Sequence, residues 1–252
     1  MESIAFEKAG IIKPGVPVVS GTVSEGPRQV FINESVKKGS DIYFAGSEYS
    51  VSYALTDMDG CQVVAAEKNG QPVYPGLKLD LTGRYQHKNL PTVLKAIDLL
   101  RERGWKIEDK NICEGLCRVM DITGLQGRWQ VIGNNPLIVC DTAHNADGIS
   151  EVVKQIKQTP YKKLHIVFGM VSDKDHEKII KLLPPDAFYY FTKADIPRAM
   201  DEKKLQSLAS VNGLKGKSYP TVAGAYKAAR DNAGKDDFIF IGGSNFVVAE
   251  VL

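Results

Sequence analysis

The segment Leu137–Gly148 reads LIVCDTAHNADG, an apolar strand that runs into a polar tip and then into a helix start. Ligands of open parallel sheets bind at the carboxyl ends of the strands, so Asp141 and His144 are expected at the mouth of a crevice. There a carboxylate can accept hydrogen bonds from a ribose or hold a cation, and an imidazole can carry a proton or bind a ligand. The alternative is that Asp141 caps the following helix and His144 lies exposed in its first turn.

Strands and helices alternate from this segment to the end of the chain. Strands are predicted over 137–141, 164–168, 188–192 and 238–241, and helices over 148–157, 174–183, 202–211 and 222–233. This alternation predicts an α/β fold with a parallel sheet covered by helices. The carboxyl ends of the strands then meet at one edge, the expected ligand edge, at Asp141, Gly169, Thr192 and Gly242.

Two further polar tips follow strands of this sheet. Gly169 precedes a helix start that contains Asp173, which lies either beside a ligand or at the helix cap. Gly242-Gly243-Ser244 lets the backbone approach a ligand closely, and its N–H groups with the Ser244 hydroxyl would bind an anion. The alternative at this second tip is a tight strand-to-helix turn.

The first half of the chain has a different pattern. A short helix, a strand over 16–20 and a helix over 28–38 are followed by three strands, separated by the turn signals Asp59-Gly60 and Asn69-Gly70. These strands are predicted over Ser50–Thr56, Gln62–Glu67 and Gln71–Tyr74. A helix is predicted over 89–103, with Asn89 at its start and Pro91 in its first turn, and a connector over 115–130.

The composition is that of an ordinary globular protein, with 43% hydrophobic and 25% charged residues in 252. A net charge of +2 gives no electrostatic reason to expect nucleic acid or an anionic membrane as a partner. No apolar run approaches the ~18 residues of a membrane span, and no signal peptide is visible, so we expect a cytoplasmic protein. The four cysteines form no zinc-like pattern and are expected to be free thiols.

Several familiar catalytic motifs are absent from the 252 residues. They contain no P-loop, no dinucleotide-binding fingerprint, no nucleophile elbow and no His-Glu-x-x-His.

Six blocks of sequence, in order along the chain, together resemble one family, folylpolyglutamate synthase and the bifunctional dihydrofolate synthase, relatives of the Mur ligases. The first and fourth blocks are specific, and the others are individually weak. The blocks are Ile4-Ala5-Phe6-Glu7-Lys8-Ala9-Gly10-Ile11-Ile12-Lys13-Pro14-Gly15, Leu81-x-Gly83-x-x-Gln86-x-x-Asn89, Gly127-Arg128, Asp141-x-Ala143-His144-Asn145, Asp173-Lys174-Asp175 and Gly242-Gly243-Ser244.

This resemblance implies a domain organisation. Residues 1–115 would be the C-terminal part of a P-loop-type ATPase domain, 116–130 a hinge, and 131–252 a complete Rossmann-like C-terminal domain with a mainly parallel sheet. The family's P-loop precedes the first block, so the chain is similar to a catalytically incomplete fragment. A partial ATPase domain is expected to expose apolar surface.

The resemblance also implies an activity, an ATP-dependent ligase that adds L-glutamate to a folate or to dihydropteroate through an acyl phosphate, with Mg²⁺. Lys8 and His144 would be the catalytic residues, Lys8 as a carbamate that helps to organise the magnesium ion. Asn89 would contact adenine, Arg128 would reach the phosphates, and Asp141 with His144 would complete the nucleotide site. Ser244 and Asp173 would lie near the glutamate.

The chain departs from the family pattern at several positions. Thr142 stands where the family usually has Gly, and Tyr85 stands where it usually has His. Two other functions stay open from the sequence. One is a standalone nucleotide- or amino-acid-binding module without catalysis. The other is a fragment of a Mur-type peptidoglycan ligase, against which the block around Lys8 argues.

Overall fold

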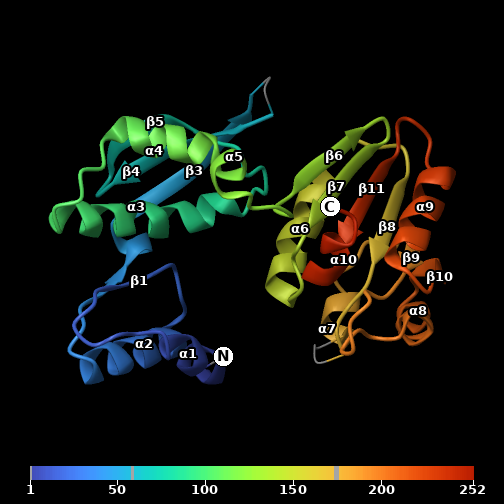
Figure 1. Ribbon diagram of the computed structural model, residues 1–252, viewed down its shortest axis with the longest axis horizontal. Coiled ribbons are helices and arrows are strands. Elements are labelled where there is room, and N and C mark those ends of the chain that lie inside the picture. Colours follow the sequence, from blue (N-terminus) through green and yellow to red (C-terminus); the bar gives the residue numbers. More distant parts are fainter. Residues whose placement is uncertain (1, 58–59, 173–175) are drawn as a thin grey trace. The chain divides into compact units, whose positions relative to one another are not determined.

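The computed structural model describes residues 2–57, 60–172 and 176–252, and the chain divides into two compact units (Figure 1). Unit 1 comprises Met1–Asp80 and Arg84–Ile122, and unit 2 comprises Leu81–Gly83 and Thr123–Leu252. None of the described helices is both long enough and apolar enough to cross a membrane.

A six-stranded sheet in the order β10-β9-β8-β11-β7-β6 forms the centre of unit 2. Its strands are β6 (Gln130–Asn134), β7 (Leu137–Asp141), β8 (Leu164–Phe168), β9 (Phe188–Phe191), β10 (Lys215–Ser218) and β11 (Phe238–Gly242). Every neighbouring pair is parallel except β6 with β7. Gly242 pairs with both Asp141 and Phe168, so these carboxyl ends meet at one edge, as predicted.

Helices cover both faces of this sheet, and α6 and α9 lie on opposite sides of it in Figure 1. One apolar cluster joins the sheet to α6, α7 and α8, and a second joins it to α9 and α10. The central strand β11 is therefore buried along its whole length. The helices are α6 (Ala146–Gln158), α7 (His176–Ile180), α8 (Glu202–Val211), α9 (Val222–Asn232) and α10 (Asn245–Ala249).

Three elements of unit 2 were not predicted. Strand β10 consists of Lys215-Gly216-Lys217-Ser218, which carries no apolar residue because the strand lies at the edge of the sheet. Strand β6 contains Gly133 and a register shift, which interrupt the alternation. Helix α10 is only five residues long, so it shows no helical period.

Unit 1 combines a two-stranded parallel sheet with a three-stranded antiparallel sheet. The predicted hairpins are confirmed, and Asn69 and Gly70 adopt the positive φ angles (51° and 74°) that their turn requires. The elements are α1 (Glu2–Ala9), β1 (Val18–Ser20), α2 (Glu25–Lys37), β2 (Ile42–Phe44), η1 (Ala45–Ser47), β3 (Tyr49–Thr56), β4 (Gln62–Lys68), β5 (Gln71–Leu79), α3 (Gln86–Glu102), α4 (Asp109–Cys117) and α5 (Val119–Thr123).

Several boundaries predicted for unit 1 were wrong, and the strand predicted over Gln71–Tyr74 extends to Leu79. Helix α3 begins at Gln86, so Pro91 lies in its second turn and Asn89 does not cap it. The helix tolerates this proline at the cost of one backbone hydrogen bond. The connector predicted over 115–130 contains the end of α4 and all of α5, whose few residues give little periodicity.

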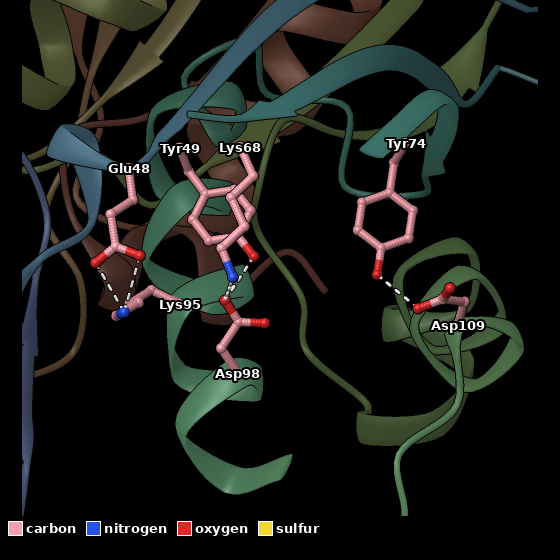
Figure 2. Close-up of polar contacts among 7 residues, drawn as sticks. All are labelled: Glu48, Tyr49, Lys68, Tyr74, Lys95, Asp98 and Asp109. Atoms are coloured by element: carbon pink, nitrogen blue, oxygen red, sulfur yellow. Dashed lines mark hydrogen bonds and ion pairs between the residues drawn. The ribbon is translucent and has the colours of Figure 1, made fainter. Parts of the chain in front are cut away.

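Polar contacts attach the antiparallel sheet to α3 (Figure 2). Asp98 accepts hydrogen bonds from the Tyr49 hydroxyl at 2.7 Å and from Lys68 Nζ at 2.6 Å. Lys95 is 6% exposed, and its ammonium pairs with Glu48 at 2.7 Å. Burial, and then the bond to Asp98, raise the pKa of Tyr49, so its phenol remains a donor.

The four cysteines are free thiols, as predicted. Cys140 is buried beside the candidate site, and burial with the Asp141 charge raises its pKa to about 12. Its thiol is therefore protonated and unreactive at neutral pH.

Candidate functional site

Asp141, at the end of β7, is 1% exposed. Its Oδ2 accepts a hydrogen bond from the Trp129 backbone N–H at 2.7 Å, and its Oδ1 accepts one from the Ala143 N–H at 2.8 Å. The alternative that Asp141 caps the next helix is wrong, because Asn145 caps α6 by accepting from the Gly148 N–H. Asp141 therefore fixes the backbone of the polar tip and of the preceding loop.

Trp129 is held in this loop at three points. Its φ of 52° is uncommon for a residue other than glycine, so the surrounding contacts must maintain it. Its N–H bonds to Asp141, and its carbonyl accepts from the Thr82 hydroxyl at 2.8 Å. Its indole is buried against Phe238 and Phe240, with ring centroids 6.1 and 6.2 Å away.

Gly127 lets this loop lie directly on the tip of β7. Its φ is 73°, and a Cβ at this position would lie 2.6 Å from Thr142 Cγ2. The Gly127 carbonyl accepts from the Thr142 N–H at 2.9 Å and from the Thr142 hydroxyl at 3.0 Å. Only glycine fits both the φ angle and the space.

Arg128 lies between these two fixed residues, and its side chain is exposed. Its Nη1 donates to Thr142 Oγ1 at 3.0 Å. No other partner engages the guanidinium within the part of the chain that the structure describes. A guanidinium has five N–H donors, so most of them remain free to bind an anion.

His144 is half-buried on the other side of Thr142. Its Nδ1 lies 3.0 Å from the Thr142 carbonyl, which can only accept, so Nδ1 carries the proton in this contact. With Nδ1 as the donor, Nε2 can act as an acceptor, and no partner engages it among the residues that the structure describes. Thr142 thus positions both the Arg128 guanidinium and the His144 imidazole at the predicted ligand edge.

Ser244 follows β11 at the same edge and is 4% exposed. It caps α10, because its Oγ accepts from the Phe246 N–H at 3.2 Å. Gly243 before it has a φ of 91°, and a Cβ there would lie 2.6 Å from the Gly169 carbonyl. The structure therefore shows the tight capped turn that was the alternative here, with the Ser244 O–H left as a donor.

The remaining candidate residues lie elsewhere in the chain. Lys8 is exposed on α1, and Asn89 is exposed on α3, where it donates to Gln86 Oε1 at 2.7 Å. Both belong to unit 1, whereas Arg128, Asp141, His144 and Ser244 belong to unit 2. Asp173 lies outside the described residues.

The described residues do not by themselves fit a magnesium site. Among them, no three His, Cys, Asp or Glu side chains gather as metal ligands would. Magnesium prefers oxygen ligands, and the Asp141 carboxylate is already bonded to two backbone N–H groups. A magnesium ion would need further oxygen ligands, such as those of substrate phosphates.

The residues that hold the site together are not evident from local sequence patterns. In the sequence, Thr142 is only a departure from a family pattern. Gln155 is 9% exposed on the apolar face of α6, and its Nε2 donates to the Thr82 carbonyl at 3.0 Å. A polar residue among the buried positions of an amphipathic helix is a signal that could have identified this contact.

Comparison with known proteins agrees with this architecture. Residues 127–245 match the Mur ligase, glutamate ligase domain family. The probable bifunctional folylpolyglutamate synthase/dihydropteroate synthase of Haloferax volcanii is 30% identical over 255 residues, which cover 98% of this chain and 29% of the relative. The dihydrofolate synthase/folylpolyglutamate synthase of Bacillus subtilis is 25% identical over 258 residues, covering 100% of this chain and 57% of the relative.

A solved structure extends the similarity to three dimensions. E. coli FolC in complex with DHPP and ADP superposes with a TM-score of 0.79 and 26% identity, over 99% of this chain and 55% of that protein. The chain thus spans little more than half the length of FolC and of the Bacillus relative, and less of the Haloferax one.

Fold, site and comparisons together define a Mur ligase C-terminal domain in unit 2. More specifically, the chain matches the C-terminal portion of folylpolyglutamate synthases and dihydrofolate synthases, which confirms the resemblance inferred from the motifs.

Proposed function

We propose that the chain provides the glutamate-ligase domain and part of the nucleotide site of an ATP-dependent enzyme that adds L-glutamate to a folate or to dihydropteroate. The observation that carries this proposal is the arrangement around Thr142, which holds the exposed Arg128 guanidinium and the His144 imidazole at the carboxyl edge of a parallel sheet. The glutamate ligase domain match and the ADP in the similar FolC structure support it.

The proposed reaction has two steps. A substrate carboxylate attacks the γ-phosphorus of ATP, the bond to the β–γ bridging oxygen breaks, and ADP leaves with an acyl phosphate formed. The glutamate amine then attacks the acyl carbon, inorganic phosphate leaves, and the amine loses its proton. Arg128 would stabilise negative charge on the phosphates, and His144 would lie near the γ-phosphate. Asp141 would act by positioning the loop that carries Arg128.

The other proposed roles depend on the family resemblance. Asn89 would contact the adenine, and Ser244 with Asp173 would lie near the incoming glutamate. Lys8 would become carbamylated, which turns an ammonium into a carboxylate that can help to organise Mg²⁺. Its exposed position without an ion pair in the described part of the chain is compatible with this modification.

We also propose that residues 1–115 are part of an ATPase domain, 116–130 a linker and 131–252 the glutamate-ligase domain. The boundary between Ile122 and Thr123 falls inside this linker, which supports the division. Ile4, Phe6 and Ile11 are 55, 60 and 83% exposed, an apolar surface suited to packing against further chain. Because the 252 residues hold no P-loop, we expect them to be inactive alone.

The test is glutamate-dependent release of ADP from ATP, with a reduced folate or dihydropteroate as acceptor. We expect no release from the 252 residues alone and release once a P-loop-bearing segment of this family is joined to them. In the joined protein His144→Ala should abolish release, while the exposed Asp147→Asn change in the same region should not. Unchanged turnover in His144→Ala would refute the role of His144.

The two other functions give different results in the same assay. A binding module without catalysis would bind ATP but show no release in any combination. A Mur-type peptidoglycan ligase would depend on alanine or diaminopimelate in place of glutamate.

A further inference from the structure

A second pocket in unit 2 lies away from the candidate nucleotide site. It has a volume of about 300 Å³, and Lys163, His165, Phe188 and Tyr190 are among its lining residues. Lys163 directly precedes β8 and Phe188 is the first residue of β9, so the pocket lies near the amino ends of these strands. The candidate nucleotide site lies at the carboxyl ends of the strands.

The pocket exists because α9 does not cover this part of the sheet. Helix α9 ends at Asn232, which also lines the pocket. Lys217 of the edge strand β10 and Phe188 of β9 are left exposed, Phe188 to 37%. A concave surface of this size is at the small end of the range for ligand pockets.

Aromatic side chains form much of its wall. The Phe188 and Tyr190 rings lie 5.2 Å apart in an edge-to-face arrangement, and the Tyr190 and Tyr219 rings lie 5.8 Å apart. All three line the pocket. Such surfaces favour planar, aromatic ligands.

The charged groups around the pocket are cationic. Lys163 and Lys217 line it, whereas no Asp or Glu does. Within the described part of the chain, neither ammonium group has an ion-pair partner. Two unpaired lysines beside aromatic walls favour an anionic ligand.

The floor of the pocket is a fixed chain of hydrogen bonds. His165 is 5% exposed, with Nε2 3.4 Å from Asp237 Oδ2 and Nδ1 3.1 Å from the Tyr190 hydroxyl. Burial alone would raise the pKa of Asp237, but bonds from the Gly234 N–H, from His165 and from the Lys163 N–H lower it overall. The ionised carboxylate accepts a hydrogen bond from His165 Nε2–H, so Nδ1 can accept a hydrogen bond from the Tyr190 hydroxyl.

Tyr190 is neutral within this chain of bonds. Burial is the main cause that raises the pKa of Tyr190 to about 12. The phenol is then neither a nucleophile nor a repelling anion at neutral pH. The buried Asp237 charge is satisfied by backbone N–H groups behind the floor, so the lysines dominate at the opening.

We propose that this pocket binds a small planar anion, an aromatic or heteroaromatic ring that carries one carboxylate or phosphate group. The ring would lie against Phe188 and Tyr219, and the anionic group would lie between Lys163 and Lys217. The proposed ligase reaction uses none of these residues, so this inference stands independently of it.

The experiment is an NMR titration of the 252-residue protein with four probes. Benzoate and phenyl phosphate carry both a ring and a charge, acetate carries only the charge, and benzamide carries only the ring. The variants are Lys163→Gln, Lys217→Gln and their combination. Lys215→Gln is the matched control, because Lys215 is exposed on the same strand but does not line the pocket.

We expect benzoate or phenyl phosphate to shift the resonances of His165 and Tyr190 saturably, and the tighter of the two identifies the anionic group. Each single lysine variant should bind about fivefold more weakly, and Lys215→Gln should bind as the wild type does. The proposal is overturned if acetate or benzamide binds as tightly as the ring-bearing anions. It is equally overturned if the double variant binds as the wild type does, or if no probe shifts these resonances.

Discussion

The Asp141 carboxylate accepts the Trp129 backbone N–H at 2.7 Å and so ties the end of β7 to the loop that carries Arg128. The same carboxylate binds the Ala143 N–H at the start of the polar tip. One buried side chain therefore sets the backbone on both sides of the candidate nucleotide site.

Asp141→Asn should destabilise unit 2. An amide offers one acceptor oxygen in place of two, so one buried N–H group loses its partner, at a cost of about 2–3 kcal/mol. The two tryptophans are Trp105, 64% exposed in unit 1, and the buried Trp129. In a Trp105→Phe background, urea unfolding followed by Trp129 fluorescence reports on unit 2 alone. The exposed Asp147→Asn change is the control, and an equal effect of the two substitutions would contradict this role of Asp141.

Gly127→Ala should cost more than an ordinary substitution at a positive φ. Gly124 has a φ of 68° and no atom within 4 Å of the position that a Cβ would take, so Gly124→Ala measures the φ penalty alone, about 1 kcal/mol. Gly127→Ala adds the contact at 2.6 Å with Thr142 Cγ2. Thr142→Gly removes that methyl group and should recover part of the loss. Additive effects in the double variant, measured by urea unfolding, would show that the two residues do not meet.

Glu48→Gln should destabilise unit 1 because it leaves the buried Lys95 ammonium without a charged partner (Figure 2). We expect a loss of about 3 kcal/mol, and a smaller one when Lys95→Met removes the charge as well. Hydrogen exchange of the α3 amides measures the change. The exposed pair of Arg118 and Glu114 in the same unit provides the control Glu114→Gln, which should change protection little. If Glu48→Gln has no larger effect than this control, the pair does not stabilise α3.

Asp237 should make the stability of unit 2 depend on pH in the acid range. Its pKa is lower in the folded than in the unfolded protein, so the unfolded state binds more protons and stability falls as pH falls. The ionised Asp237 carboxylate contributes fully to the free energy of unfolding above its unfolded-state pKa of about 3.9. This contribution is lost as the pH falls through the pKa of Asp237 in the folded protein. Asp237→Asn should therefore be less stable than the wild type at pH 7, with a difference that shrinks below pH 4.

The exposed neighbour Asp236 supplies the control for this pH series. Asp236→Asn should follow the wild type at every pH in urea unfolding. If the difference in unfolding free energy between Asp237→Asn and the wild type stays constant from pH 7 to pH 3, the lowered pKa of Asp237 is contradicted.

The sequence predicts the sheet of unit 2 well because its central strands are apolar runs that end in glycine or polar residues. Periodicity does not find β10, which has the composition of a loop and is a strand only because it pairs with β9. It also places the start of α3 too late, because Pro91 is typical of a first helical turn. At β10, pairing with a neighbouring strand overrides the local signal.

The sequence predicts which chemical groups form the candidate site, but it does not predict the hydrogen bonds that hold them together. Asp141, His144 and Arg128 are identified by their types and by family resemblance. That Thr142 joins Arg128 to His144, and that Asp141 bonds to Trp129, depends on a loop twelve or more residues away in sequence. No local pattern encodes such a contact, so the fold must be known first.

The most direct test of the central claim is an NMR titration of the protein with MgATP, observing the His144 ring and the Arg128 Nε–H. We predict saturable shifts at both residues that adenosine does not cause, and weaker binding in Arg128→Gln but not in the control Lys215→Gln. A nucleotide-phosphate site at this edge would be contradicted if MgATP shifted neither residue. It would also be contradicted if Arg128→Gln bound MgATP as tightly as the wild type does.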